Sequence, residues 1–139
     1  MSDEIIRKYL SRNGGGPPTD PDPESDSDGT EDVGGAFGWV RGVRDRAISL
    51  ELRKKDGTIL AINYSWIERF EFEPSEGITL YAGGKKLTIK GRNLNAETRP
   101  LIRLFSGLCR HRVPWVVEAD LAAQLKAGPA ATVIDQIVW

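Results

Sequence analysis

Cys109 and His111 have the strongest intrinsic chemistry of the side chains in this chain, and a single residue separates them. A thiolate and an imidazole can ligate zinc, but a structural zinc site needs four protein ligands and a catalytic one needs three. The sequence holds no other cysteine and no other histidine. A cysteine nucleophile with a histidine base also needs a third group that orients the base, and none is evident. We therefore expect Cys109 to pack under a helix and His111 to lie at its C-terminal end.

A second group with metal-binding potential is the acidic series Glu24, Asp26 and Asp28, which Gly29 follows. An EF-hand calcium loop requires a bidentate glutamate at its twelfth position and a helix on either side. The twelfth position here is Gly35, and proline and glycine flank the series. The series therefore indicates a solvated acidic linker, and we predict neither a metal site nor a cofactor.

Basic side chains lie around two predicted hairpin turns. If the ends of the two hairpins converge, these residues form a positive face that can contact phosphates through charge alone. The alternative is that they are outward-facing residues that discourage pairing at the edges of a sheet. The residues concerned are Arg53, Lys54, Lys55, Lys85, Lys86, Lys90 and Arg92.

The segment from Ile89 to Leu94, with the sequence IKGRNL, resembles the second Sm motif of the Sm and Sm-like RNA-binding proteins. This resemblance implies a five-stranded open barrel, and it implies that Lys90, Gly91 and Asn93 help to hold a nucleotide base. The first Sm motif would fall on residues 63–67, where Ile67 replaces the base-contacting asparagine. The candidate nucleic-acid-binding residues are then Lys54, Lys55, Lys85, Lys86, Lys90, Gly91, Arg92 and Asn93.

The stretch from Ala47 to Leu94 must position these residues. Its alternation of apolar and polar side chains indicates a small antiparallel sheet, divided by turn signals at 56–57, 74–77 and 83–84. Ser65 and Trp66 indicate a tight connection. We predict five strands joined in a meander, with an apolar core of Leu50, Leu52, Leu60, Ile62, Phe70, Phe72, Leu80, Leu87 and Ile89.

After Leu94 the apolar residues have helical spacing. The pattern predicts a helix over 99–111, with Thr98 as its cap, packed on the open face or end of the sheet through Leu101, Leu104, Phe105 and Leu108. Trp115 to Val117 has the composition of a short strand, and Asp120 is expected to cap a second helix that ends before Gly128. Residues 132–139 have helical spacing but β-branched content, which favours a strand that returns to the sheet.

The N-terminal third differs in composition from the rest. Residues 13–36 contain almost no apolar side chains and are rich in Gly, Pro, Asp and Ser, so we predict a disordered acidic linker. Residues 1–12 form a short amphipathic helix in this prediction, and its apolar face is a candidate partner-binding surface made of Ile5, Ile6, Tyr9 and Leu10. A chance amphipathic pattern in a frayed terminus is the alternative.

Charge and cysteine usage limit the broad class of protein. Residues 1–38 carry nine acidic and three basic side chains, whereas residues 39–139 carry 11 acidic and 16 basic ones. This asymmetry indicates an electrostatic partner or an acidic tail that keeps the domain in solution. The acidic N-terminus lacks the features of a signal peptide, no apolar run is long enough to span a membrane, and one cysteine cannot form an internal disulfide. We therefore expect a cytoplasmic protein.

These observations together predict an α+β fold, with a strongly bent antiparallel sheet of five or six strands, or a partial barrel, and one or two C-terminal helices. A single domain would span residues 37–139. Neither a paired acid and base nor a phosphate-binding loop is visible, so we do not expect an enzyme. We expect a non-enzymatic binding or adaptor module for an unidentified protein partner, tethered to the N-terminal docking helix. The alternative is an Sm-like RNA-binding oligomer.

Overall fold

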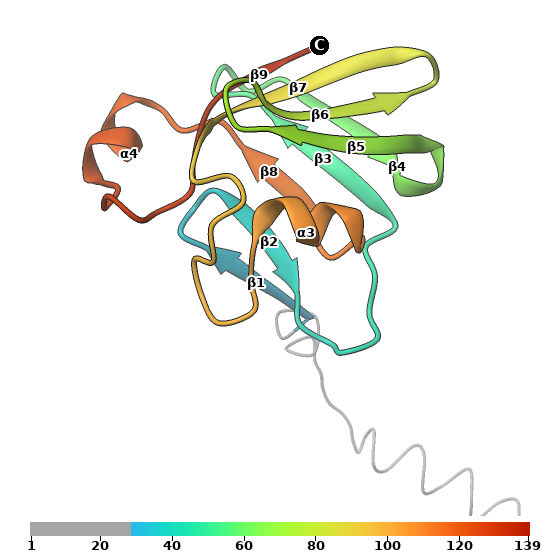
Figure 1. Cartoon of the computed structure of the whole chain (residues 1–139), viewed down its shortest axis with the longest axis horizontal. Helices are drawn as coiled ribbons and strands as arrows, with labels where there is room; N and C mark the ends of the chain where they lie inside the picture. The colour runs from blue at the N-terminus through green and yellow to red at the C-terminus, as the bar shows by residue number, and fades with distance from the viewer. Residues whose placement is uncertain (1–28) are drawn as a thin grey trace, which may run out of the picture. The chain divides into compact units, whose positions relative to one another are not determined.

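The structure, a computed structural model, describes residues 29–139. The predicted docking helix over 1–12 and most of the predicted linker lie outside these residues. Within the described part, nine strands form two sheets, and two α-helices of six residues each follow in the C-terminal third (Figure 1). The predicted α+β class, with a bent sheet and C-terminal helices, is confirmed. Neither helix is long enough to cross a membrane.

The first sheet has five strands in the order β1-β2-β8-β3-β4. β3 and β4 form the predicted hairpin, in which Leu52 lies opposite Leu60 and Leu50 lies opposite Ile62. β8 lies between β2 and β3, antiparallel to the former and parallel to the latter. The strands are β1 (Thr30–Val33), β2 (Phe37–Val40), β3 (Ser49–Arg53), β4 (Ile59–Asn63) and β8 (Trp115–Val117).

The second sheet has four strands in the order β5-β6-β7-β9, and all its pairings are antiparallel. β9 pairs with β7, so the prediction that the C-terminal segment is a strand that returns to the sheet is confirmed. The strands are β5 (Ile67–Glu73), β6 (Gly77–Ala82), β7 (Lys85–Arg92) and β9 (Val133–Val138).

The predicted five-strand meander is wrong at one connection, because β4 does not pair with β5. A 3₁₀ turn, η2 (Tyr64–Trp66), carries the chain from the first sheet to the second. The Asn63 side chain accepts a hydrogen bond from the Ser65 N–H at 2.9 Å, which fixes the start of this turn. Tyr64 is buried, and its hydroxyl donates to the Val113 carbonyl at 2.6 Å. The buried tyrosine therefore anchors a change of sheet where the residue pattern alone suggested a hairpin.

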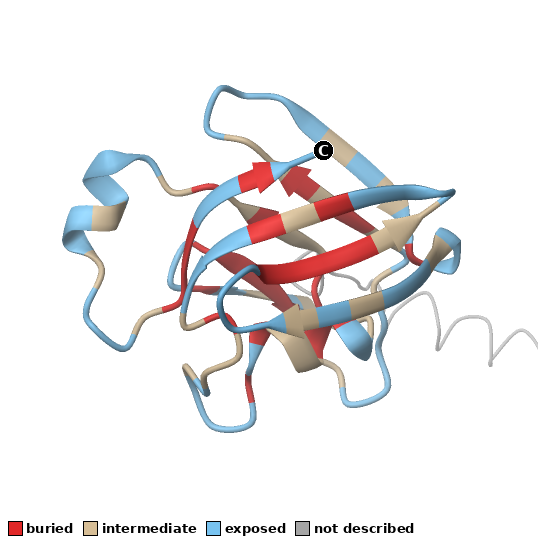
Figure 2. Cartoon of the chain, turned by 45° about the horizontal axis from the view of Figure 1, so that its top comes forward, coloured by how far each residue is buried: buried red, intermediate tan, exposed pale blue. Residues whose placement is uncertain are grey.

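The core lies between the two sheets and under α3 (Leu104–Cys109), as the buried segments in Figure 2 show. α3 touches both sheets. The Phe105 ring lies 5.7 Å from the ring of Phe72 on β5, and Gly107 packs against Trp39 on β2. Of the predicted core, these residues are buried: Leu50, Leu52, Leu80, Leu87, Ile89, Leu104 and Leu108. The remaining predicted members are half-buried: Leu60, Ile62, Phe70, Phe72 and Phe105.

α3 is shorter than the predicted helix over 99–111. Leu101 is 86% exposed and has a φ of 68°, so it does not belong to the apolar face of the helix. Pro100 and this left-handed residue delay the start of the helix to Leu104. The spacing of Leu104, Phe105 and Leu108 predicted the packed face correctly, whereas the inclusion of Leu101 was wrong.

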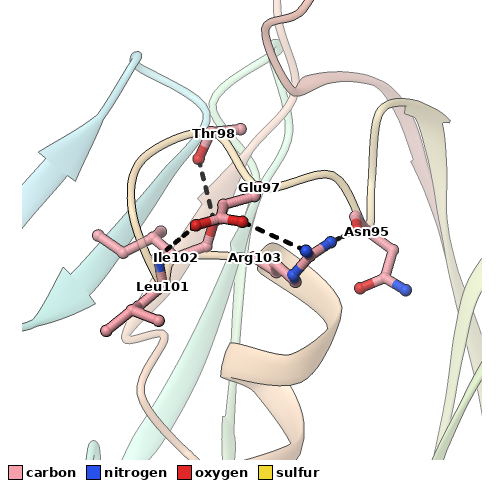
Figure 3. Close-up of polar contacts among 6 residues, drawn as sticks. All are labelled: Asn95, Glu97, Thr98, Leu101, Ile102 and Arg103. Atoms are coloured by element: carbon pink, nitrogen blue, oxygen red, sulfur yellow. Dashed lines mark hydrogen bonds and ion pairs between the residues drawn. The ribbon is translucent and has the colours of Figure 1, made fainter.

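The segment before α3 folds around the Glu97 carboxylate (Figure 3). Oε2 of Glu97 accepts the Leu101 N–H at 2.8 Å, and Oε1 accepts from Nη2 of Arg103 at 3.3 Å. Thr98 was predicted to cap the helix, and this prediction is wrong. Its hydroxyl donates instead to the Ile102 carbonyl at 3.4 Å. The N-cap of α3 is Arg103, which makes no side-chain capping bond.

Two further boundaries can be compared with the predictions. The folded part begins earlier than residue 37, because Thr30–Val33 forms β1 and Val33 and Ala36 are buried. The predicted linker therefore extends too far. Residues 29–36 are rich in glycine and acidic residues, and this composition predicted disorder although the segment contains two apolar side chains that are buried. The predicted second helix is present as α4 (Leu121–Lys126), and Asp120 caps it by accepting the Ala123 N–H at 2.8 Å.

Candidate partner-binding groove

An open groove of about 640 Å³ lies between β4 and the hairpin of β6 and β7. Among residues 29–139, its lining is mainly aliphatic and aromatic, with two lysines at the rim and no acidic residue. Apolar concave sites with a few polar groups at defined places are the usual form of a binding site. The lining residues are Leu60, Ile62, Trp66, Ala82, Gly83, Lys85, Lys86, Leu87 and Trp139.

β4 supplies one wall of the groove. Leu60 and Ile62 share a face with their cross-strand partners Leu52 and Leu50, which are fully buried. Both β4 residues are only half-buried, because in the described part of the chain β4 is the last strand of its sheet and has no neighbour on its other side. Position at the sheet margin therefore leaves two aliphatic side chains that the fold itself does not fully cover.

Trp66 extends this wall from the end of η2. It is 68% exposed, although the turn that carries it is fixed by Asn63 and by the buried side chain of Tyr64. A large aromatic side chain held on a rigid turn and left open to water is unusual in a core-building role. Such residues are enriched at binding surfaces, because they bury a large area at little cost in conformational entropy.

Trp139 follows β9 and lines the groove from the second sheet. It is 42% exposed, and Nζ of Lys54 lies 4.1 Å from the centroid of its ring. The turn that carries Lys54 is joined to β9 by Glu118, a buried carboxylate. Oε1 of Glu118 accepts the Lys55 N–H at 2.8 Å, and Oε2 accepts the Ile137 N–H at 2.6 Å. Glu118 therefore holds Lys54 and Trp139 in register across the two sheets.

Lys85 and Lys86 form the basic rim at the start of β7. The turn before them contains Gly83 and Gly84, whose φ values are 59° and 80°. A two-residue hairpin turn that matches the right-handed twist of its strands requires positive φ at both positions. This turn pairs Lys85 with Ala82 and Lys86 with Tyr81. Both lysine side chains are exposed, so the rim is positively charged.

The structure brings together part of the predicted nucleic-acid-binding set. Lys54, Lys85 and Lys86 lie at the groove, whereas Lys55 lies on the exposed β3–β4 turn and does not line it.

The other four predicted residues lie at the far end of β7, beside β9 and the segment after α4. Gly91 lies at an irregularity in the pairing of β7 with β9, and a Cβ there would collide with the Val133 carbonyl. Nδ2 of Asn93 donates to the carbonyls of Pro129 and Ala131, at 3.0 and 2.7 Å. Gly91 and Asn93 therefore have structural roles that explain their presence. Their neighbours Lys90 and Arg92 are exposed, and Nη2 of Arg92 lies 3.4 Å from the Gln124 carbonyl.

Cys109 and His111 lie at the end of α3, and neither of them lines the groove. Cys109 is exposed, so the expectation that it packs under the helix is wrong; the large side chains that this six-residue helix buries are those of Leu104 and Leu108. Partial desolvation raises the pKa of the Cys109 thiol above its usual value. The His111 ring stacks on Tyr64, with 4.4 Å between ring centroids. Among residues 29–139, no group of three or more His, Cys, Asp or Glu side chains could hold a metal ion.

The predicted docking residues Ile5, Ile6, Tyr9 and Leu10 lie outside the described residues. The two tryptophans and the two β4 side chains were not predicted as a site. The available signal was a tryptophan in a tight connection and another directly after a strand, but only the structure brings them to one surface. Comparisons with protein-family models, curated proteins and solved structures found no match for this chain.

Proposed function

We propose that this protein is a non-enzymatic binding module that holds a short apolar and acidic segment of a protein partner in the groove between β4 and the β6–β7 hairpin. The observation that supports this proposal is the combination of two exposed tryptophans, Trp66 and Trp139, with a half-buried aliphatic wall and a basic rim. Aromatic anchors beside apolar pockets account for most of the binding energy in typical protein interfaces. The expected cytoplasmic location is part of this proposal.

The charges around the groove favour an acidic partner. Lys54, Lys85 and Lys86 lie at or beside the groove, and no acidic side chain of the described residues lines it. Complementary charge speeds association and rejects partners of like charge, whereas the apolar contacts supply most of the affinity. A segment that presents leucine-like and acidic side chains on the same face satisfies both requirements.

A fluorescence titration tests the proposal with a defined probe. The probe is an eight-residue peptide in which leucine and glutamate take turns at every second position with serine between them, so that an extended backbone presents both on one face, and the control peptide carries lysine in place of glutamate. We expect saturable binding of the acidic peptide to the full chain and none of the basic one. The double variant Lys85→Glu/Lys86→Glu should lose this binding.

A matched variant controls for net charge. Lys90 and Lys126 are exposed and do not line the groove, so Lys90→Glu/Lys126→Glu changes the charge of the protein by the same amount. This variant should bind the acidic peptide with nearly unchanged affinity. Equal losses in both double variants would show that only net charge matters and would refute a site at the groove.

Single-stranded RNA is the second candidate ligand, because the groove combines lysines with two exposed aromatic rings. Such surfaces bind single strands by stacking bases and contacting phosphates. Titration with oligouridylate at low and high salt tests this candidate. Binding that depends on Lys85 and Lys86 would support RNA at the groove, whereas dependence on Lys90 and Arg92 would support the Sm-like alternative. No binding at low salt would exclude both.

A further inference from the structure

β4 is the last strand of the first sheet, and its outer edge is unpaired among residues 29–139. The Tyr64 N–H donates to the Ile48 carbonyl, and the Lys54 N–H donates to the Thr58 carbonyl. These two bonds determine which residue pairs between β3 and β4 are the hydrogen-bonded ones. Alternation in an antiparallel pair then directs the N–H and C=O groups of Leu60 and Ile62 toward β3. Those of Ile59 and Ala61 point away from the sheet, and neither residue makes another backbone hydrogen bond in the described part.

This edge lacks the devices that usually prevent strand pairing. Proteins protect sheet edges with charged side chains, proline or bulges. β1 contains Glu31 and Asp32, β5 contains alternating acidic and basic residues, and β9 contains Asp135. β4 has the sequence ILAIN, with no charge and no proline. It is therefore the one uncharged edge strand of the two sheets in the described residues.

We propose that the partner segment binds as an added strand on the outer edge of β4. This inference rests on the proposed function and specifies how the segment is held. Backbone groups of the segment pair with Ile59 and Ala61, and every second side chain lies on the face of the sheet that carries Leu60 and Ile62. Strand addition of this kind obtains affinity from main-chain hydrogen bonds and specificity from pockets for alternate side chains. Figure 2 shows β4 at the margin of the first sheet, with its alternating exposed and half-buried residues.

The positive charge at the groove favours a peptide, and not a second copy of this chain, as the strand that pairs with β4. Two copies that paired through β4 would bring the lysine-bearing grooves, with Lys54, Lys85 and Lys86, next to each other. Like charges that face each other across an interface oppose association. An acidic extended segment meets the same lysines with attraction. The occupant is therefore an extended peptide that presents apolar and acidic side chains on the same face, the face that lies toward Leu60 and Ile62.

Backbone methylation of the peptide tests strand addition directly. A series of the leucine–glutamate peptide with one N-methyl group at each successive amide leaves every side chain unchanged. Methylation of an amide that pairs with β4 should lower the affinity of the peptide for the protein about tenfold, because one backbone hydrogen bond is lost. Methylation of the neighbouring amides should not, so sensitivity should recur at every second residue. Uniform sensitivity or none would overturn strand addition, while Lys85- and Lys86-dependent binding of the unmodified peptide would still support the groove.

A variant of β4 tests the same inference on the protein side. Ala61→Pro removes an outward N–H and leaves the β3 ladder intact, and Ala61→Ser is the matched control that retains the N–H. Peptide affinity should fall about tenfold for the proline variant and remain unchanged for the serine variant. If the proline variant does not fold, the methylation series decides. Sedimentation that shows a wild-type dimer and a monomeric Ala61→Pro would mean that a second copy occupies the edge, and would overturn the inference.

Discussion

Glu118 should be one of the most important single side chains for the stability of this fold. Its carboxylate is 6% exposed and joins the β3–β4 turn to β9, through hydrogen bonds from the Lys55 N–H and the Ile137 N–H. A hydrogen bond to a charged group contributes about 1.5–3 kcal/mol to stability. In Glu118→Ala, water can replace the carboxylate at Lys55, which lies on an exposed turn, but Ile137 is buried. We therefore expect a loss of about 3–5 kcal/mol in the free energy of unfolding.

Glu118→Gln separates the effect of charge from that of side-chain length. The amide has one oxygen, so it can accept from only one of the two N–H groups, and its own NH₂ faces the other. We expect a loss of about 1–3 kcal/mol, between the wild type and the alanine variant. Glu51→Ala is a suitable control, because Glu51 forms a half-exposed ion pair with Arg53 at 2.8 Å that should contribute less than about 1 kcal/mol.

Urea unfolding followed by tryptophan fluorescence measures these differences. A domain of this size has a slope of about 1–3 kcal/mol per molar urea, so Glu118→Ala should lower the midpoint by about 2 M at unchanged slope. Because Glu118 also sets the position of Trp139 beside Lys54, peptide affinity should fall in the folded variant. A midpoint for Glu118→Ala equal to that of Glu51→Ala would refute the structural role of this carboxylate.

Three other changes test separate parts of the structure. Gly91→Ala should cost about 1–3 kcal/mol in urea unfolding, because the added Cβ meets the Val133 backbone, and a neutral effect would contradict the close packing of β7 on β9. Phe72→Ala should lower the free energy of unfolding by roughly 2 kcal/mol. This is less than the roughly 3–5 kcal/mol of a fully buried ring, because Phe72 is half-buried against Phe105. A loss below about 0.5 kcal/mol would rule out this contact. Iodoacetamide should alkylate the exposed Cys109 more slowly at pH 8 than it alkylates a free thiol, because the raised pKa of Cys109 keeps the thiol protonated. The rate should rise at higher pH. A rate at pH 8 equal to that of glutathione would show that the thiol is fully hydrated.

The strands of residues 47–94 could be predicted from sequence, because each has a period of two and most turns between them have a strong local signal. The change of sheet at η2 could not, since it depends on the contact of Tyr64 with Val113, 49 residues away. α3 was predicted too long for a similar reason. The Glu97 carboxylate and a left-handed Leu101 end the periodic pattern, and neither is visible as an interruption of apolar spacing.

The candidate site was predicted only in part. Lys54, Lys85 and Lys86 were identified as basic hairpin residues, and their convergence at one groove follows from the packing of two sheets. Trp66 and Trp139 were not identified, because an aromatic residue beside a turn or at a strand end is equally compatible with a core position. Gly91 and Asn93 were assigned to base binding by resemblance, while the structure shows that both are needed for local backbone geometry.

The most direct test of the binding groove uses the four indole N–H signals of the full chain in an NMR titration with the leucine–glutamate peptide. Trp66 and Trp139 line the groove, whereas Trp39 is buried beside α3 and Trp115 lies against Arg53 on the first sheet. The proposal predicts that the Trp66 and Trp139 signals shift with saturation while those of Trp39 and Trp115 stay in place. Saturable binding that leaves Trp66 and Trp139 unshifted, or that shifts all four signals equally, would contradict it.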